Sequence, residues 1–193
     1  DDYLTKPFDL EALDAIIFKA QKAADVSAEV SLLRQEIKSH YQLERTIIGQ
    51  SPPMQKIYKV LGKVAPSDVT VLIYGESGTG KNLVAQAIHS LSRRKDGPFV
   101  ALNCGSLNDY LLESELFGLK KGSFTGASES REGLMAYAHD TTLFLDEIGE
   151  LPLGVQASLL RILETQTFRR VGEKEERKVN IRFLFATNRN LAE

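Results

Sequence analysis

Apolar residues recur at helical spacing in the first 44 residues of this chain. Two segments show the pattern. In residues 9–20 the apolar side chains share one helical face, with Asp9 as a suitable N-cap: Leu10, Leu13, Ile16, Ile17 and Ala20. In residues 23–44 they recur every three or four positions, as in a heptad seam: Val26, Val30, Leu33 and Ile37. A helix packed on its own domain and a dimeric coiled coil are both compatible with this second pattern.

From about residue 45 the pattern changes to short apolar runs that alternate with helical spacing. Four runs predict strands: Val69–Tyr74, Phe99–Asn103, Thr142–Glu147 with its buried part at Leu143–Leu145, and Ile181–Thr187. The first is rich in β-branched residues, so we expect it to be buried on both faces of a parallel sheet. Because helical patterns separate the runs, the sequence predicts an α/β fold with a mostly parallel sheet flanked by helices.

Composition narrows the possible classes only a little. The 193 residues are 42% hydrophobic and 26% charged, which suffices for one full core. A net charge of -2 and a pI near 6.0 give no overall attraction to nucleic acid or to an anionic membrane. No apolar run approaches the length of a bilayer span, so we expect a cytoplasmic protein with no membrane partner. The single cysteine, Cys104, is expected to be a small buried hydrophobe.

A glycine-rich loop lies between the first predicted strand and the helical pattern that follows it. Its sequence GESGTGK comprises Gly75, Glu76, Ser77, Gly78, Thr79, Gly80 and Lys81. In that position the glycines let backbone N–H groups face a phosphate, the helix N-terminus adds its dipole, and lysine adds a mobile cation. The sequence therefore predicts a phosphate-binding loop. Asn82 stands where the general motif offers a hydroxyl to Mg²⁺, and its amide oxygen is the group that could approach the metal.

Polar residues at the ends of the other strands complete the predicted site. Asp146 would hold Mg²⁺, and Glu147 would orient or deprotonate the attacking water. Asn103, Thr187 and Asn188 end two further strands, where an open α/β sheet keeps its ligand.

Phe124 stands between two glycines in the run KKGSFTGAS, and no apolar neighbours recur there at a helical or strand period. One interpretation is a loop whose aromatic side chain tucks under its own turn. The other is a contact surface for a partner.

Residues 47–190 resemble the AAA+ domain of bacterial enhancer-binding proteins, the ATPases that activate transcription by sigma-54 RNA polymerase. GESGTGK is similar to their Walker A motif, TLFLDEIGELP to Walker B, and FATN to the first sensor. GSFTGA differs by one residue from the GAFTGA signature of the family. The start of the chain, with Lys6 before a proline, resembles the end of a response-regulator receiver domain, in which that lysine contacts the phosphate.

The resemblance implies an organisation and a set of partners. Residues 1–22 would be a receiver remnant, residues 23–44 a helical linker, and residues 45–193 a P-loop AAA+ ATPase subdomain without arginine fingers, lid or DNA-binding domain. Its cofactors would be ATP and Mg²⁺. Its partners would be the sigma-54 holoenzyme, an upstream sensor histidine kinase and further copies in a ring, with DNA bound only through a separate C-terminal domain.

The resemblance also implies residue roles. Ile48 and Gly49 would contact adenine, and Asn103 would be a switch residue that holds Glu147. Phe124 and Thr125 would touch the sigma factor at the tip of a loop. The signature as a whole comprises Gly122, Ser123, Phe124, Thr125, Gly126 and Ala127.

Several residues depart from the usual family sequence. The family has Glu at Asn82, Ala at Ser123 and His-Glu at Leu119-Lys120, and Lys120 therefore reverses a charge at the base of the loop. It also has Phe-Glu at residues 135–136 and Gly-Gly at residues 140–141, where this chain has Met-Ala and Asp-Thr. These departures support an alternative, a nucleotide-binding or interaction scaffold that no longer hydrolyses ATP. An AAA+ remodeller with another client is a weaker alternative, because GSFTGA would have no role there.

Overall fold

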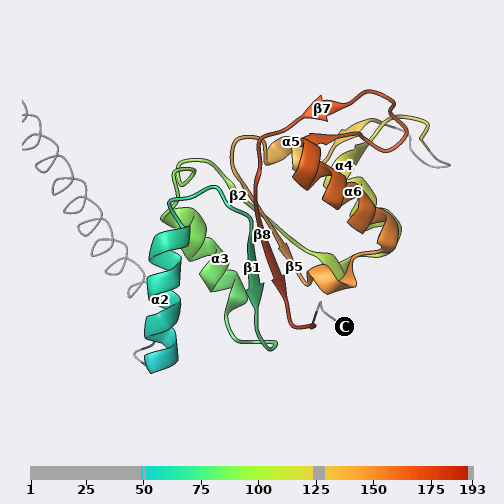
Figure 1. Cartoon of the computed structure of the whole chain (residues 1–193). Coiled ribbons are helices and arrows are strands. Elements are labelled where there is room, and N and C mark those ends of the chain that lie inside the picture. Colours follow the sequence, from blue (N-terminus) through green and yellow to red (C-terminus); the bar gives the residue numbers. More distant parts are fainter. Residues whose placement is uncertain (1–48, 50, 124–128, 191–193) are drawn as a thin grey trace, which may run out of the picture.

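The computed structural model describes residues 49, 51–123 and 129–190, and these form a four-stranded parallel sheet with helices on both faces (Figure 1). The strands lie in the order β1 (Val71–Tyr74), β8 (Arg182–Thr187), β5 (Thr142–Asp146) and β2 (Phe99–Asn103). The predicted α/β class, the parallel sheet and its four strands are confirmed. The predicted helices in residues 1–44 lie outside the described residues.

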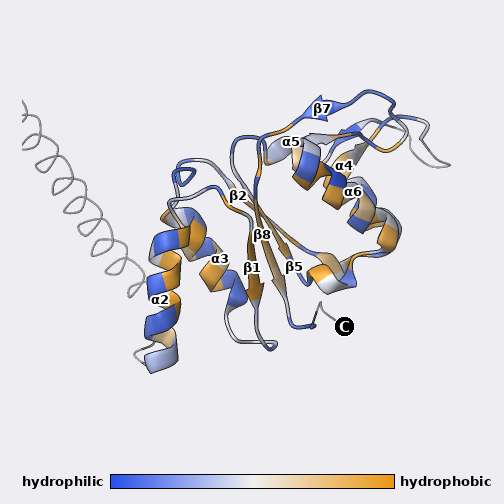
Figure 2. Cartoon of the chain, in the orientation of Figure 1, coloured by the Kyte–Doolittle hydropathy of each residue, from blue (hydrophilic) through white to orange (hydrophobic). Residues whose placement is uncertain are grey.

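Two layers of helices enclose the sheet. Helices α2 (Pro52–Val64) and α3 (Lys81–Ser90) cover one face, and α4 (Asp109–Phe117), α5 (Leu134–Tyr137) and α6 (Leu153–Thr165) cover the other. Side chains alternate along the central strands, so Phe144 and Leu184 pack on the first layer while Leu143 and Phe183 pack on the second. Figure 2 shows the apolar residues gathered along the strands and on the helix surfaces that face them. No helix among the described residues is long and apolar enough to cross a membrane.

Two small hairpins extend the second layer. Strands β3 (Gly118–Leu119) and β4 (Arg131–Glu132) pair antiparallel and form the two legs of the loop that carries GSFTGA. Strands β6 (Thr167–Phe168) and β7 (Arg177–Lys178) form a second antiparallel pair after α6. Two 3-10 turns, η1 (Cys104–Ser106) and η2 (Ile148–Glu150), follow β2 and β5.

The expectation that the first strand is buried on both faces is wrong. Within the described residues β1 pairs with β8 alone, so it forms an edge of the sheet. Leu72 and Tyr74 are 50% and 68% exposed, beside an apolar cavity of about 510 Å³ between β1 and α2. An apolar β-branched run indicates a strand, but it does not report the strand's place in the sheet.

Buried polar groups join the helices of the first layer to the sheet. The guanidinium of Arg182, on β8, donates to the carbonyls of Val64 and Ala65 at the end of α2. These carbonyls have no partner within the helix, so Arg182 serves as a partner for both and shares the Val64 carbonyl with Ser67. His89, on α3, is 6% exposed. Its Nε2 donates to the carbonyl of Gly97 at 3.2 Å, and its Nδ1 therefore accepts from the Thr142 hydroxyl at 2.9 Å.

Burial lowers the pKa of His89 below its usual 6.5, and this gives a prediction for acid stability. Above that value both folded and unfolded states hold a neutral imidazole. Below it the unfolded state binds a proton that the folded state resists, so stability falls as the pH falls through 6.5 toward the folded pKa. One proton gives a slope of at most about 1.4 kcal/mol per pH unit. Urea unfolding of the wild type between pH 7.5 and about 5 should show this loss.

The matched variant is His89→Gln, which removes the titrating imidazole and should flatten the slope. An equally steep slope in His89→Gln would show that other groups cause the acid sensitivity.

Candidate functional site

The loop between β1 and α3 has the backbone shape that its glycines predict. Gly78 and Gly80 have φ values of 79° and 86°, in the left-handed region that favours glycine. A Cβ on Gly75 would lie 3.0 Å from the Thr79 hydroxyl, so this glycine permits a tight arch. Gly80 is the N-cap of α3 and has no side chain to cap the helix, so the first N–H groups of α3 are available to a ligand.

Lys81 places a positive charge over this loop. Its ammonium donates to the carbonyl of Gly75 at 3.0 Å and to the carbonyl of Glu76 at 2.8 Å. Thr79 also bonds to Glu76, through its hydroxyl at 2.8 Å. Asn82 follows on α3 with an exposed side chain. An anion bound by the loop would therefore contact the Lys81 ammonium, which the loop carbonyls already hold in place, and the first N–H groups of α3.

Asp146 and Glu147 lie where β5 ends, and both are partly buried. The Asp146 carboxylate accepts the backbone N–H of Glu147 at 2.9 Å. Glu147 adopts φ 55°, a left-handed conformation that costs a non-glycine residue on the order of 1–3 kcal/mol.

Asn103 lies beside these acids, because it is the register partner of Asp146 in the β2–β5 pair. Its side-chain oxygen accepts the N–H of Gly105 at 2.9 Å. A Cβ on Gly105 would overlap the Glu147 carboxylate and lie 3.4 Å from the Asn103 side-chain oxygen. The side chains of Asn103 and Glu147 thus both lie next to Gly105, which leaves them room because it has no side chain. Sequence reasoning missed Gly105, since a glycine after a strand is common in any turn.

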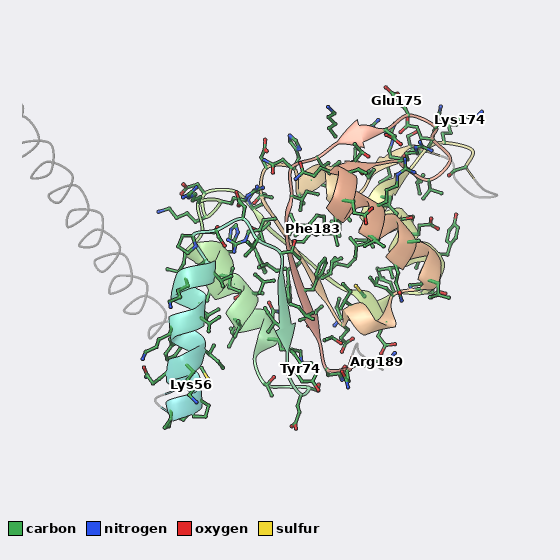
Figure 3. All side chains as sticks on the ribbon, viewed as in Figure 1. Lys56, Tyr74, Lys174, Glu175, Phe183 and Arg189 are labelled. Atoms are coloured by element: carbon green, nitrogen blue, oxygen red, sulfur yellow. The ribbon has the colours of Figure 1, made fainter. Side chains whose placement is uncertain are left out.

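The end of β8 is tied both to the loop and to η2. The carbonyl of Thr187 accepts the N–H of Gly75 at 3.2 Å, and its hydroxyl accepts the N–H of Arg189 at 3.0 Å. Arg189 in turn donates to the carbonyl of Gly149 at 3.0 Å and forms an ion pair with Glu150. Figure 3 shows Arg189 and Tyr74 at the same end of the sheet. Arg189 was not predicted, because its partners come from another part of the chain. Asn188 lies between these residues with an exposed side chain.

Gly49 lies ahead of α2, where its carbonyl accepts the Tyr58 hydroxyl at 3.0 Å. A Cβ there would lie 2.9 Å from Cγ of Met54, so the segment packs closely on the helix. Figure 1 shows that α2 starts at the end of the molecule where the sheet strands finish. Ile48 and residues 124–127 lie outside the described residues, so their predicted roles stay predictions.

The departures at residues 135–141 are accommodated by packing. Asp140 has φ 59°, which aspartate tolerates better than most residues, and its carboxylate accepts from Asn180 at 2.8 Å. Thr141 is buried and donates to the carbonyl of Pro98. Met135 is completely buried in the core of the second layer.

Cys104 is 2% exposed, and burial together with Asp146 and Glu147 raises the pKa of its thiol to about 12. The predicted role as a small buried hydrophobe fits this environment, since the thiolate is the reactive form.

Comparisons with known proteins agree with this geometry. A family model described as the sigma-54 interaction domain matches residues 47–193. The chain is 50% identical over 190 residues to the regulatory protein AtoC of Escherichia coli, and the matched region covers 98% of this chain and 41% of AtoC. It is 44% identical over 190 residues to the transcriptional regulator NtrC of Azospirillum brasilense, covering 98% and 39% respectively.

A solved structure is also similar. NtrX from Brucella abortus in complex with ATP has a TM-score of 0.70 and 34% identity to this chain, over 99% of this chain and 39% of that one. The chain therefore spans about two fifths of the length of the relatives that it matches.

Proposed function

This chain belongs to the family of sigma-54 interaction domains, and from that membership we propose that it binds and hydrolyses ATP as the AAA+ module of a response regulator that remodels sigma-54 RNA polymerase. One observation carries the proposal. The glycine loop with its lysine and the carboxylates of Asp146 and Glu147 lie at one edge of a parallel sheet, and the end of β8 bonds to the loop and, through Arg189, to η2. The ATP complex of the similar NtrX supports the choice of nucleotide.

The phosphate loop would bind the nucleotide phosphates. The N–H groups at the start of α3 donate to phosphate oxygens, and Lys81 exchanges its two carbonyl partners for them. Gly49 and Ile48 would contact the adenine. Asp146, one carboxylate at the edge of the sheet, suits Mg²⁺, which is usually held by one or two carboxylates plus phosphates and waters. When bound, Mg²⁺ neutralises charge on the phosphates, and the Asn82 amide is the further ligand available on α3.

Glu147 would orient or deprotonate the attacking water. Its left-handed backbone conformation sets the direction of the side chain, and Gly105, which has no side chain, leaves space for the carboxylate. Asn103 would sense the nucleotide state through Glu147, and Thr187 and Asn188 would act as the sensor at the end of β8. The main chain of Thr187 already bonds to the phosphate loop, which supports that role.

We propose the remaining partners of the complete protein from its family and from the additional length of its relatives. The loop at residues 122–127 would contact the sigma factor, and copies of the complete protein would assemble into a ring. A sensor histidine kinase would act on a complete receiver domain, and DNA would bind through a C-terminal domain. A scaffold that binds but does not hydrolyse ATP is the alternative, favoured by Asn82 in the place of a metal-binding hydroxyl.

The first test concerns nucleotide binding. Mg-ATP at about 100 times its dissociation constant should stabilise the chain by roughly 2.7 kcal/mol. Lys81→Ala should abolish this stabilisation, because it removes the cation over the loop. Lys63→Ala, which removes an exposed lysine at the end of α2, is the control and should leave it intact. Denaturant unfolding with and without ligand measures the difference, and a wild type insensitive to Mg-ATP would refute the site.

The second test separates the ATPase from the scaffold. In the full-length protein, Glu147→Gln should keep ATP binding and slow phosphate release by about 10² to 10⁴. Gly105→Ala should act in the same direction, because its methyl group displaces the Glu147 carboxylate. Gly154→Ala adds a methyl group that meets nothing within 4 Å and serves as the control. A wild type that binds ATP with no phosphate release above that of Glu147→Gln would favour the scaffold.

The third test concerns the loop. Phe124→Ala and Thr125→Ala should leave ATP binding nearly unchanged and remove binding to sigma-54 holoenzyme in the presence of an ATP transition-state analogue. If Phe124 is instead tucked into the core, truncation should cost about 3 to 5 kcal/mol of stability. Sigma-factor pull-down beside a denaturant melt distinguishes the two. Ser123→Ala restores the usual family loop and is the control.

A further inference from the structure

We infer that Arg189 is a positioning residue for Glu147, because its guanidinium holds the η2 turn that begins directly after this glutamate. The inference deepens the proposed function and rests on it, since Glu147 is the residue proposed to orient or deprotonate the attacking water. Arg189 acts through the main chain of η2 and not through a contact of its own with phosphate.

Arg189 binds two consecutive residues of η2. Its Nη1 donates to the carbonyl of Gly149 at 3.0 Å, and its Nη2 forms an ion pair with the carboxylate of Glu150. A guanidinium is planar and presents its N–H groups in a rigid fork, whereas an ammonium acts as a point charge. The two contacts therefore fix the orientation of the turn relative to Arg189.

The aliphatic stem of Arg189 also lies close to η2. A Cβ on Gly149 would lie 3.0 Å from Cδ of Arg189 and 3.4 Å from the Thr187 hydroxyl. Because Gly149 has no side chain, the stem can approach the turn this closely. Gly149 thus supplies both a carbonyl for the guanidinium and the space that the methylene groups occupy.

Arg189 is itself anchored at the end of β8, a strand that is paired on both sides. Its N–H donates to the hydroxyl of Thr187 at 3.0 Å, and Thr187 is buried. The carbonyl of Thr187 accepts the N–H of Gly75, the first residue of the phosphate loop. Figure 3 shows Arg189 at the end of the sheet where the strands finish. Residues 187–189 therefore hold η2 at a fixed place relative to the phosphate loop.

The backbone of Glu147 is constrained by η2. Glu147 is the N-cap of the turn with φ 55°, and its carbonyl accepts the N–H of Glu150 at 2.9 Å. A residue persists in the left-handed region when the surrounding structure keeps it there. The Glu147 side chain makes no capping bond to η2, and its carboxylate lies next to Gly105. Release of the turn would let this backbone relax and carry the carboxylate away from Gly105.

Solvent exposure decides which property of the protein Arg189 controls. The side chains of Arg189 and Glu150 are 56% and 41% exposed, and ion pairs this open to water contribute little to global stability. A displacement of a catalytic group by about 1 Å, in contrast, can lower a rate by about 10². We therefore expect loss of Arg189 to change the rate of hydrolysis far more than the stability of the fold.

The test uses Arg189→Met in the full-length protein, because methionine keeps an apolar stem beside Gly149 and removes every donor of the guanidinium. The kcat for phosphate release should fall by about 10- to 100-fold. The dissociation constant for Mg-ATP and the denaturation midpoint should stay at their wild-type values. Arg189→Lys should retain part of the rate, because an ammonium can replace one of the two contacts but not both.

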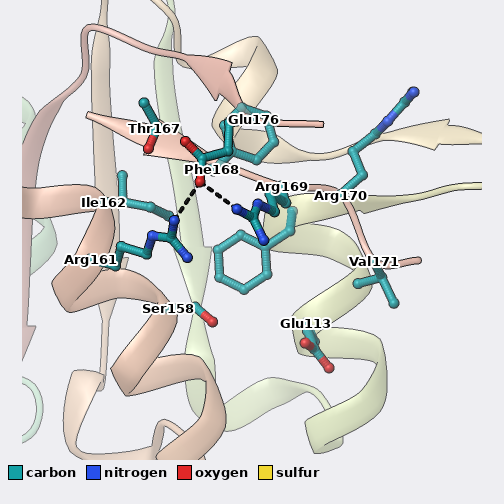
Figure 4. Close-up of a pocket in the computed structure, with 11 residues that line it drawn as sticks. Glu113, Ser158, Arg161, Ile162, Thr167, Phe168, Arg169, Arg170, Val171 and Glu176 are labelled. Atoms are coloured by element: carbon teal, nitrogen blue, oxygen red, sulfur yellow. Dashed lines mark hydrogen bonds and ion pairs between the residues drawn. The ribbon is translucent and has the colours of Figure 1, made fainter. Parts of the chain in front are cut away.

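Arg161→Met is the matched control. Arg161 lies on α6 and forms an ion pair with Glu176, and the two side chains are 54% and 37% exposed (Figure 4). This pair is about as open to water as the pair of Arg189, and both of its members lie outside η2 and β8. The control should therefore keep the wild-type kcat.

A double-mutant cycle shows whether Arg189 acts through Glu147. If it does, adding Arg189→Met to Glu147→Gln should slow phosphate release no further, because the group that Arg189 positions is already lost. A direct contact of Arg189 with phosphate would instead slow both backgrounds by the same factor or weaken Mg-ATP binding. Either of these results overturns the inference, and so does a wild-type kcat in Arg189→Met.

A measurement that needs no hydrolysis separates the inference from the proposed function. The Glu150 amide donates to Glu147 within the turn, and its hydrogen exchange should be at least about tenfold faster in Arg189→Met. Arg161→Met should exchange at the wild-type rate. Unchanged exchange in Arg189→Met overturns the hold on η2. A wild type that does not hydrolyse ATP refutes the proposed function, and the exchange result then decides by itself whether Arg189 holds the turn.

Discussion

Parallel pairing of β1, β8, β5 and β2 brings the carboxyl ends of four strands to one edge of the sheet, and the candidate site depends on it. The register places Asn103 opposite Asp146 and Tyr74 opposite Thr187. The Gly75–Thr187 bond then ties the phosphate loop to β8, and Arg189 ties β8 to η2. A one-residue slip between β5 and either neighbour would turn the side chains of the slipped strand to the opposite face and separate these groups.

Strain at this edge is consistent with a site held for chemistry rather than for stability. Glu147 in a left-handed turn costs on the order of 1–3 kcal/mol, a noticeable share of the 5–15 kcal/mol by which domains are typically stable. The neighbouring Gly105 leaves the space that the carboxylate fills. The buried strand between Thr142 and Leu145 supplies the apolar packing that offsets such a cost.

Sequence patterns predicted the strands, the phosphate loop and the acids after β5, because each is a local run with its own period and turn signals. They did not predict the edge position of β1, which depends on pairing far along the chain. Arg189 and the ion pair between Glu132 and Arg177 were missed for the same reason: Glu132 and Arg177 are 45 residues apart and meet only in the folded chain. Composition carries no signal for such contacts, and Phe124 falls outside the described residues.

Some departures from the usual family sequence lie at packing positions near β5, and others lie where the loop contacts the β6–β7 hairpin. Met135 and Thr141 are buried, and Asp140 suits its left-handed backbone, so these changes alter packing and leave the groups at the carboxyl edge in place. Lys120 and Ser123 instead lie at the β6–β7 hairpin, where the Lys120 N–H donates to the carbonyl of Val171 and Gly172 lies close against Ser123. The departures at Lys120 and Ser123 therefore lie where the hairpin contacts the loop, whereas Asn82, at the start of α3, is the departure that lies at the carboxyl edge of the sheet.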